Sequence, residues 1–87
     1  MSNKVKNLID KELKKIKKPR ILEFGVEYGN STKYFLQNIK AGNLISIDIS
    51  DCSHLFKNKQ WTFINCRDDN YKIINKYLKK KIDIIFV

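Results

Sequence analysis

The stretch Ile21–Thr32, with the sequence ILEFGVEYGNST, decides how this chain folds. It opens with a short apolar run that ends at Phe24 and is bounded by Gly25, as is typical of a buried β-strand. A loop with two glycines follows, and Ser31 and Thr32 are natural N-cap residues for a helix. The stretch therefore predicts a strand, a glycine-rich turn and a helix in direct succession.

The sequence on either side of this stretch repeats the alternation of helix and strand. Apolar residues at spacings of three and four predict an amphipathic helix over residues 3–18. Pro19 ends it, because proline disfavours helical geometry in the residue before it. Gly42 is expected to close the helix that follows the glycine loop. Three further apolar runs predict strands over residues 44–49, 61–65 and 82–87.

A third helix is predicted between the last two strands, with Asp68 or Asp69 as its cap. Alternating strands and helices favour an α/β fold with a Rossmann-like parallel sheet of four strands in the order 3-2-1-4 and helices on both faces. Residues 1–19 then form an N-terminal helix, and residues 20–87 form the sheet domain. The strand over 82–87 would have a neighbour on one side only, so the chain looks truncated, and this edge is expected to self-associate.

The composition limits the cellular setting and the partners. No apolar run approaches the roughly 18 residues of a membrane span, and the N-terminus lacks the apolar region of a signal peptide. Cys52 and Cys66 are too few for a disulfide framework, so we expect reduced thiols and a cytoplasmic protein without a membrane partner. With 18 Lys and Arg against nine Asp and Glu, the formal charge is +9, which assists nonspecific binding to polyanions.

The positions of the basic residues argue against a nucleic acid as the substrate. One cluster, Lys17, Lys18 and Arg20, precedes the first strand, and another, residues 79–81, precedes the fourth. Both would lie at the amino edge of the sheet, opposite the edge where α/β proteins bind ligands. We interpret them as a solvated surface and expect a small-molecule partner.

The ligand site is expected where the first strand turns into its helix. Glycines let the backbone approach a ligand closely, and the helix N-terminus attracts anionic groups. Asp48 ends the second strand, where a carboxylate can accept hydrogen bonds from both hydroxyls of a ribose. A dinucleotide site would need glycines where this chain has Glu27 and Asn30, and a phosphate-binding P-loop would need Gly-Lys-Ser or Gly-Lys-Thr.

The string ILEFGVEYGNST with the later ISID resembles motif I and the acidic post-strand position of class I S-adenosylmethionine-dependent methyltransferases. Its GxxxGxS form is most similar to the branch that contains catechol O-methyltransferase. The resemblance covers Ile21–Val87. It implies S-adenosylmethionine as the cofactor and methyl transfer to a small-molecule acceptor.

The same resemblance implies roles for residues of the loop. Glu23 would hold the loop and lie near the methionine amino group of the cofactor, and Ser31 would meet the methionine carboxylate. Gly25 and Gly29 would let the backbone pass beside the cofactor. Glu27 is an unusual charge in such a loop and is expected to contact the sulfonium or the amino group.

Two further residues would complete the cofactor site. By the resemblance, Asp48 takes the ribose hydroxyls, and Asp68 borders the adenine from the turn 65–68. The family often has Gly-Asp or Gly-Ala-Ser at that turn, from which this chain departs. Structural interpretations stay open: Ser31 can simply cap its helix, and Asp48 can simply begin a turn.

Other assignments follow less well from the residues. Cys52, His54 and Cys66 do not have a usual zinc spacing, so no metal is expected. In the resembling families an acidic residue that handles the acceptor follows the fourth strand; Val87 precedes that position, so no catalytic residue is named and these 87 residues alone are expected to be inactive. The alternatives are a noncatalytic nucleotide-binding remnant and a basic nucleic-acid-binding domain, which would show steep salt dependence.

Overall fold

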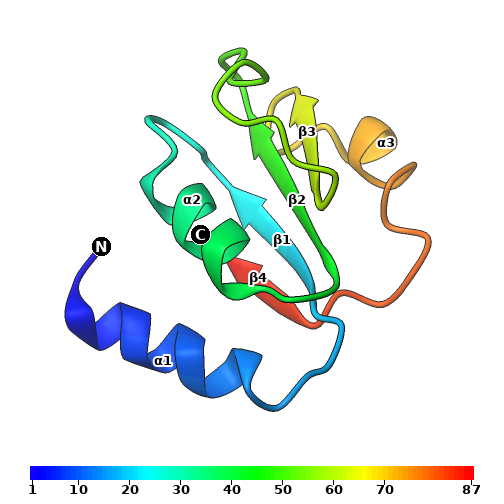
Figure 1. Cartoon of the computed structure of the whole chain (residues 1–87). Coiled ribbons are helices and arrows are strands. Elements are labelled where there is room, and N and C mark those ends of the chain that lie inside the picture. Colours follow the sequence, from blue (N-terminus) through cyan, green and yellow to red (C-terminus); the bar gives the residue numbers. More distant parts are fainter.

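Four parallel strands form one sheet in the order β3-β2-β1-β4, as the sequence predicts (Figure 1). The computed structural model describes residues 1–87. Its elements in chain order are α1 (Asn3–Leu13), β1 (Arg20–Phe24), α2 (Asn30–Asn38), β2 (Asn43–Asp48), β3 (Trp61–Asn65), α3 (Tyr71–Ile74) and β4 (Ile84–Phe86). None of the three helices has the length and apolar character of a membrane span.

The strand register brings the carboxyl ends of the strands together. β1 lies between β2 and β4, with Glu23 opposite Ser46 on one side and Phe86 on the other. β2 in turn pairs with β3, so that Asp48 is opposite Asn65. The loops that follow β1, β2 and β3 therefore leave the sheet at a single edge, where ligands bind in folds of this kind.

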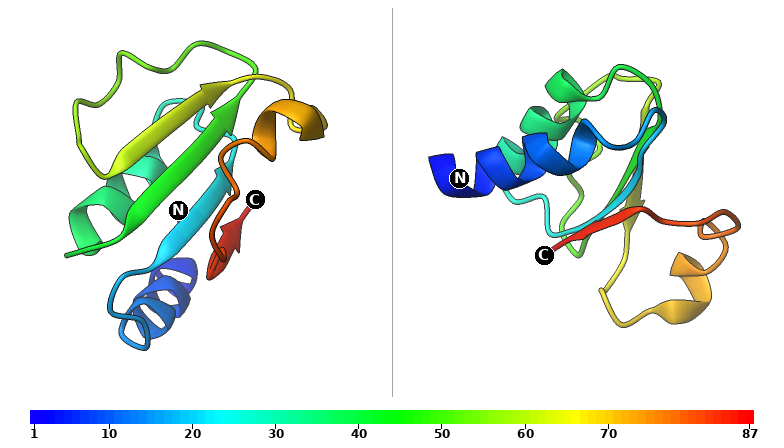
Figure 2. Two further views of the ribbon diagram at one scale, coloured as in Figure 1. Left: turned by 90° about the vertical axis from the view of Figure 1, so that its right-hand side faces the viewer. Right: turned by 90° about the horizontal axis from the view of Figure 1, so that it is seen from below.

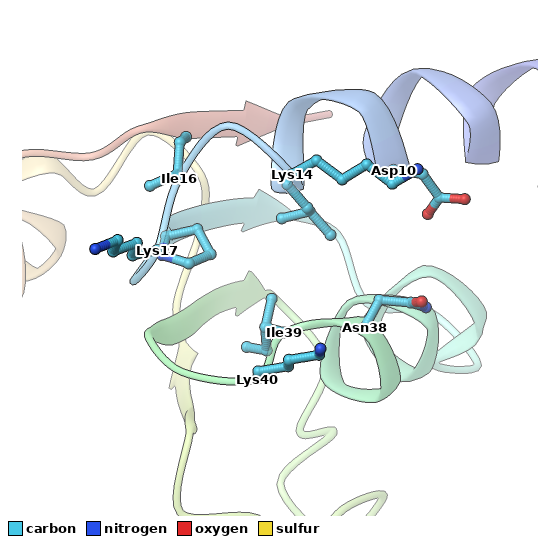
Figure 3. A pocket seen from close by; sticks show the side chains of 9 residues that line it. Asp10, Lys14, Ile16, Lys17, Asn38, Ile39 and Lys40 are labelled. Carbon is cyan, nitrogen blue, oxygen red and sulfur yellow. The ribbon is translucent and has the colours of Figure 1, made fainter.

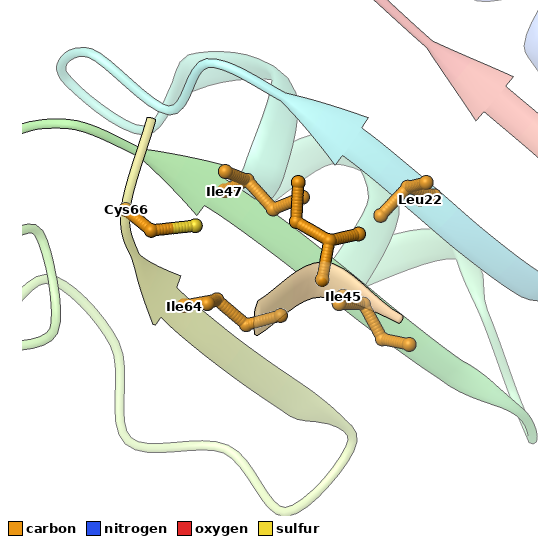
Figure 4. Close-up of a cluster of buried hydrophobic side chains, with 6 residues drawn as sticks. Leu22, Ile45, Ile47, Ile64 and Cys66 are labelled. Carbon is orange, nitrogen blue, oxygen red and sulfur yellow. The ribbon is translucent and has the colours of Figure 1, made fainter. Parts of the chain in front are cut away.

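Helices cover both faces of the sheet, which confirms the predicted layers (Figure 2). Successive strand residues point to opposite faces, so Ile21 packs with α1 and α2 while Leu22 faces α3. The first face holds the buried cluster Ile9, Ile21, Phe35, Ile39 and Leu44. The second holds Leu22, Ile45, Ile47, Ile64, Cys66 and Ile74 (Figure 4). Each fully buried aliphatic side chain of this kind stabilises the fold by about 1.5 to 3 kcal/mol.

The first helix is shorter than predicted, because it ends at Leu13 and not near Lys18. The chain needs the intervening residues to turn back into the sheet, and buried Pro19 anchors that turn. The carbonyl of Pro19 accepts a hydrogen bond from Asn43 N at 2.9 Å. A Cβ added to Gly42, whose φ is +104°, would lie 2.2 Å from the same carbonyl oxygen. The role predicted for Gly42 was therefore wrong: it permits this close approach, and α2 ends at Asn38.

The other boundaries also differ from those predicted. Gly29, not Ser31 or Thr32, occupies the N-cap position of α2. Asn70, not Asp68 or Asp69, caps α3, and its side chain accepts a hydrogen bond from Ile73 N. α3 is a single turn, β2 begins and ends one residue earlier than expected, and β4 covers only Ile84–Phe86. Ser31 and Thr32 do not cap α2 because their hydroxyls donate hydrogen bonds to the buried carboxylate of Glu23.

Candidate functional site at the carboxyl edge of the sheet

Three adjoining hollows surround the glycine loop. The first, of about 520 Å³, lies beyond β1 and β2 and has Asp48, Arg67 and Asp68 in its wall. The second, of about 330 Å³, lies on the α2 side of the loop, and the third, of about 460 Å³, lies between Asp48 and Glu27. Gly25, Glu27 and Asp48 each line two of the hollows. The hollows therefore share parts of their walls around the loop.

The carboxylate of Asp48 holds the glycine loop in place. Its Oδ2 accepts hydrogen bonds from Val26 N at 2.8 Å and Glu27 N at 3.0 Å, and its Oδ1 accepts one from Ser50 N at 2.9 Å. Desolvation by partial burial raises the pKa of Asp48, but these amide hydrogen bonds outweigh it and the pKa is lowered. Asp48 is therefore a fixed negative charge. Its Oδ2 is occupied by two amides, and its Oδ1, with one amide donor, keeps a lone pair for a ligand hydroxyl.

Glu23 is completely buried beneath the loop. Its carboxylate accepts hydrogen bonds from Ser31 Oγ at 2.5 Å, Thr32 Oγ1 at 2.6 Å and Ser46 Oγ at 2.8 Å. Ser46 Oγ in turn accepts a hydrogen bond from Trp61 Nε1 at 2.9 Å. No cation pairs with Glu23, so hydroxyl donors alone compensate a charge that would otherwise be costly to bury. Glu23 thus fastens the first turn of α2 to the sheet.

The two glycines of the loop have different surroundings. Both have positive φ, at +91° for Gly25 and +87° for Gly29. A Cβ at Gly29 would lie 2.9 Å from the ring of Phe56, whereas a Cβ at Gly25 would meet nothing within 4 Å. Gly29 is therefore required by internal packing, and Gly25 leaves open space towards two hollows. Glu27 also has a positive φ of 53°, a conformation uncommon for a side-chain-bearing residue.

The N-terminus of α2 points towards the second hollow. No side chain caps this helix, so the backbone N–H groups of its first turn are left to donate to a ligand. The Ser31 hydroxyl, for which the resemblance implies contact with a ligand carboxylate, donates instead to Glu23. A carboxylate in the second hollow would therefore meet the first-turn amides, with the helix dipole in its favour.

The first hollow combines apolar walls with polar groups at its rim. Arg67 donates two hydrogen bonds to the carboxylate of Asp69, each at 3.1 Å, and this raises the pKa of Arg67. Asp68 beside them is exposed and has no such partner. The apolar wall consists of Phe24, Ile47, Ile49, Cys66 and Val87. A flat apolar ring with hydrogen-bonding groups on its rim fits such walls.

The walls of the three hollows carry net negative charge. Glu27, Asp48 and Asp68 line them, and the only cationic side chain among their lining residues is that of Arg67. That guanidinium is already paired with Asp69. Excess carboxylates in a partly desolvated site attract cationic ligands and repel phosphates.

Both cysteines are buried next to the candidate site. Burial is the main cause that raises the pKa of both thiols, Cys52 and Cys66. Cys52 Sγ lies 3.8 Å from the carbonyl oxygen of Glu27 and so lies behind the glycine loop. Nowhere in the chain do three His, Cys, Asp or Glu side chains gather in a way that could hold a metal ion.

The structure brings most of the predicted residues to one edge. Gly25, Glu27, Asp48 and Asp68 line the hollows. Ser31 lines the second hollow, while Gly29 is buried and Glu23 lies wholly beneath the loop. Sequence reasoning missed three residues that support these, namely Thr32, Ser46 and Phe56. The polar Ser46 inside an otherwise apolar strand was the available signal.

Comparison of the chain with family models, with curated proteins and with solved structures finds no match.

Proposed function

We propose that the carboxyl edge binds S-adenosylmethionine and that the chain is the cofactor-binding part of a methyltransferase acting on a small-molecule acceptor. The observation that carries this proposal is the engagement of Val26 N and Glu27 N by Asp48. Two donors of the loop are thereby taken by a carboxylate of the chain, and its charge would repel a pyrophosphate placed beside them. With a carboxylate already in that position, the loop favours a nucleoside ligand without phosphates.

The charge of the site supports the same ligand. S-adenosylmethionine carries a sulfonium and an ammonium against one carboxylate, so its net charge is positive, whereas NAD and ATP are anionic. Glu27, Asp48 and Asp68 line the hollows, and the only cationic side chain in the walls belongs to Arg67, which is paired with Asp69. The Coulomb attraction between one of these carboxylates and a ligand cation about 4 Å away amounts to a few kcal/mol at an intermediate dielectric constant.

The three hollows also accommodate the parts of this molecule. The apolar walls beside Asp68 suit the adenine, and the remaining lone pair of Asp48 Oδ1 suits a ribose hydroxyl. The uncapped first turn of α2 suits the methionine carboxylate, and Glu27 suits the positive groups. When bound, the cofactor would supply an activated methyl group, and the residues of the chain would position it. A cytoplasmic location fits the two free thiols.

Isothermal titration calorimetry tests the ligand directly. We expect S-adenosylmethionine to bind more tightly than S-adenosylhomocysteine, which lacks the sulfonium charge, and NAD and ATP to bind more weakly than either. Glu27→Gln should weaken S-adenosylmethionine more than S-adenosylhomocysteine. Glu12→Gln removes the same charge from α1, far from the site, and should change neither. Preference for NAD, or an equal effect of Glu27→Gln on both ligands, would refute the proposal.

A further inference from the structure

The amino edge of the sheet gathers positive charge from three connections that are distant in sequence. They are the α1–β1, α2–β2 and α3–β4 connections, and Figure 1 shows them meeting where β1, β2 and β4 begin. Hydrogen bonds join them: Asn43 N donates to the carbonyl of Pro19, and Asp83 N donates to the carbonyl of Arg20. We define the basic edge as Arg20, the first residue of β1, together with eight lysines of these connections: Lys14, Lys15, Lys17, Lys18, Lys40, Lys79, Lys80 and Lys81. Lys76, which follows α3 closely, is not included.

The charge of the basic edge is almost entirely unpaired within the chain. Every lysine in it is exposed, and only Lys15 has an acidic partner, Glu12, at 3.3 Å. The carboxylate of Asp83 accepts a hydrogen bond from the backbone N of Arg20 at 2.9 Å and forms no ion pair with the guanidinium. The Nε of Arg20 is buried and has no hydrogen-bond partner. This leaves a strong positive potential at one end of the molecule.

The basic edge also contains a hollow. Lys14, Lys17 and Lys40 contribute to the wall of a cavity of about 500 Å³ between the C-terminal ends of α1 and α2 (Figure 3). Asp10 lines the same cavity, but its carboxylate accepts a hydrogen bond from Tyr34 Oη at 2.5 Å, which raises the pKa of that phenol. The cavity gives an anionic group a recess among lysines from two connections, α1–β1 and α2–β2.

Positive charge predominates at one end of the parallel strands and negative charge lines the hollows at the other. The glycine-loop end carries Glu27, Asp48 and Asp68 in its hollows, and the strand-start end carries the basic edge. A polyanion would be repelled from the ligand site and attracted to the other end. Contact at the basic edge would therefore leave the ligand site free.

We propose that the basic edge docks the phosphodiester backbone of a nucleic acid, at a surface separate from the ligand site. A lipid surface fits less well, because interfacial binding needs apolar side chains beside the charges. Among the exposed large apolar residues of the chain only Tyr77 lies in these three connections. An acidic protein partner also needs an apolar interface centre, whereas phosphate contacts need only cations.

Fluorescence anisotropy with a labelled 20-base-pair DNA duplex, and with RNA of matching sequence, tests this proposal between 50 and 300 mM salt. The triple variant Lys17→Gln, Lys40→Gln, Lys80→Gln takes one charge from each connection. The matched control Lys4→Gln, Lys33→Gln, Lys72→Gln removes the same charge from exposed sites outside the basic edge. We expect the logarithm of the binding constant to fall linearly with the logarithm of salt concentration, and the slope to shrink by about three in the first triple, close to one per phosphate contact.

The control triple should change the slope by less than one, and circular dichroism should show both variants folded. Equal weakening by the two triples would mean that net charge alone drives binding, and the proposal fails. Failure of the wild-type chain to bind duplex or RNA at 50 mM salt also refutes it. Tighter binding to phosphatidylcholine vesicles with 30% phosphatidylserine than to either nucleic acid, lost in the first triple, would assign the surface to lipid instead.

Discussion

Asp48 Oδ2 lies 2.8 Å from Val26 N and so joins the end of β2 to the glycine loop after β1. The same oxygen accepts from Glu27 N, whose residue has a positive φ. The loop is thus held by a carboxylate of the neighbouring strand, and its shape depends on that charge. A ligand would meet a loop that is already formed, which lowers the entropy cost of binding.

Asp48→Asn should therefore destabilise the fold and weaken ligand binding. The amide has one acceptor oxygen for three backbone donors, so we expect a loss of roughly 1 to 3 kcal/mol in the free energy of unfolding at pH 7. Because the pKa of Asp48 is lowered by folding from its ordinary 3.8, the wild type keeps this advantage above that pH and loses it as the pH falls below. Urea denaturation between pH 7 and pH 3 measures the difference.

A matched control for this substitution lies nearby. Asp51 accepts hydrogen bonds only from Ser53 N and Oγ in its own turn, at 3.0 and 2.6 Å. Asp51→Asn removes the same charge without touching the glycine loop, and should leave the affinity for S-adenosylmethionine within twofold of wild type. Equal losses in the two variants would contradict the role of Asp48 in holding the loop.

The two glycines of the loop should respond differently to alanine. Gly25→Ala meets no neighbour and should cost about 1 to 2 kcal/mol of backbone strain. Gly29→Ala adds a clash with Phe56, whose ring also packs edge-on against Trp61 at 5.3 Å between centroids. We expect Gly29→Ala to cost about 2 to 4 kcal/mol in denaturant titrations. Phe56→Leu should recover part of that loss in the double variant, and additive losses would argue against the clash.

Glu23→Gln tests the buried carboxylate. Glutamine has the same shape as glutamate, but it replaces one acceptor oxygen with an NH₂ group, which is a donor. That group would face hydroxyls that donate to an oxygen in the wild type, so we expect a loss of about 2 to 3 kcal/mol in unfolding free energy. Trp61 is the only tryptophan and donates to Ser46, so its fluorescence reports on this network. Ser46→Ala should shift the emission while costing less, since two hydroxyls still reach Glu23. Unchanged stability of Glu23→Gln would contradict the importance of the charge.

β4 forms one edge of the sheet. β4 pairs only with β1, and Ile85 and Val87 are 62% and 92% exposed. An apolar strand with a free edge invites pairing with another chain, so we propose self-association at this edge. Ile85→Lys should shift sedimentation velocity profiles towards monomer, and Leu8→Lys, at an exposed apolar site on α1, should not. A wild-type chain that stays monomeric at high concentration would refute this.

The sequence alone determined the strand order, the layers and the edge where the candidate site lies. Periodicity and glycine position identify buried strands and the turns between them, and right-handed crossovers then leave few topologies. Residues 21–24 and 61–65 were predicted as strands almost to the residue. Local pattern sufficed there, because burial on both faces of a parallel sheet demands continuous apolar runs.

Only the tertiary structure decided the partners of the polar groups. Ser31 and Thr32 have the local character of helix caps, yet they bond Glu23 because a buried carboxylate needs donors more than a solvent-exposed helix end does. The helix over 3–18 stops at Leu13 because Pro19 must reach Gly42, a contact between residues that are far apart in the chain. Likewise, Asp48 engages the loop amides because parallel pairing places the ends of β1 and β2 together, a geometry that exists only once the sheet has formed.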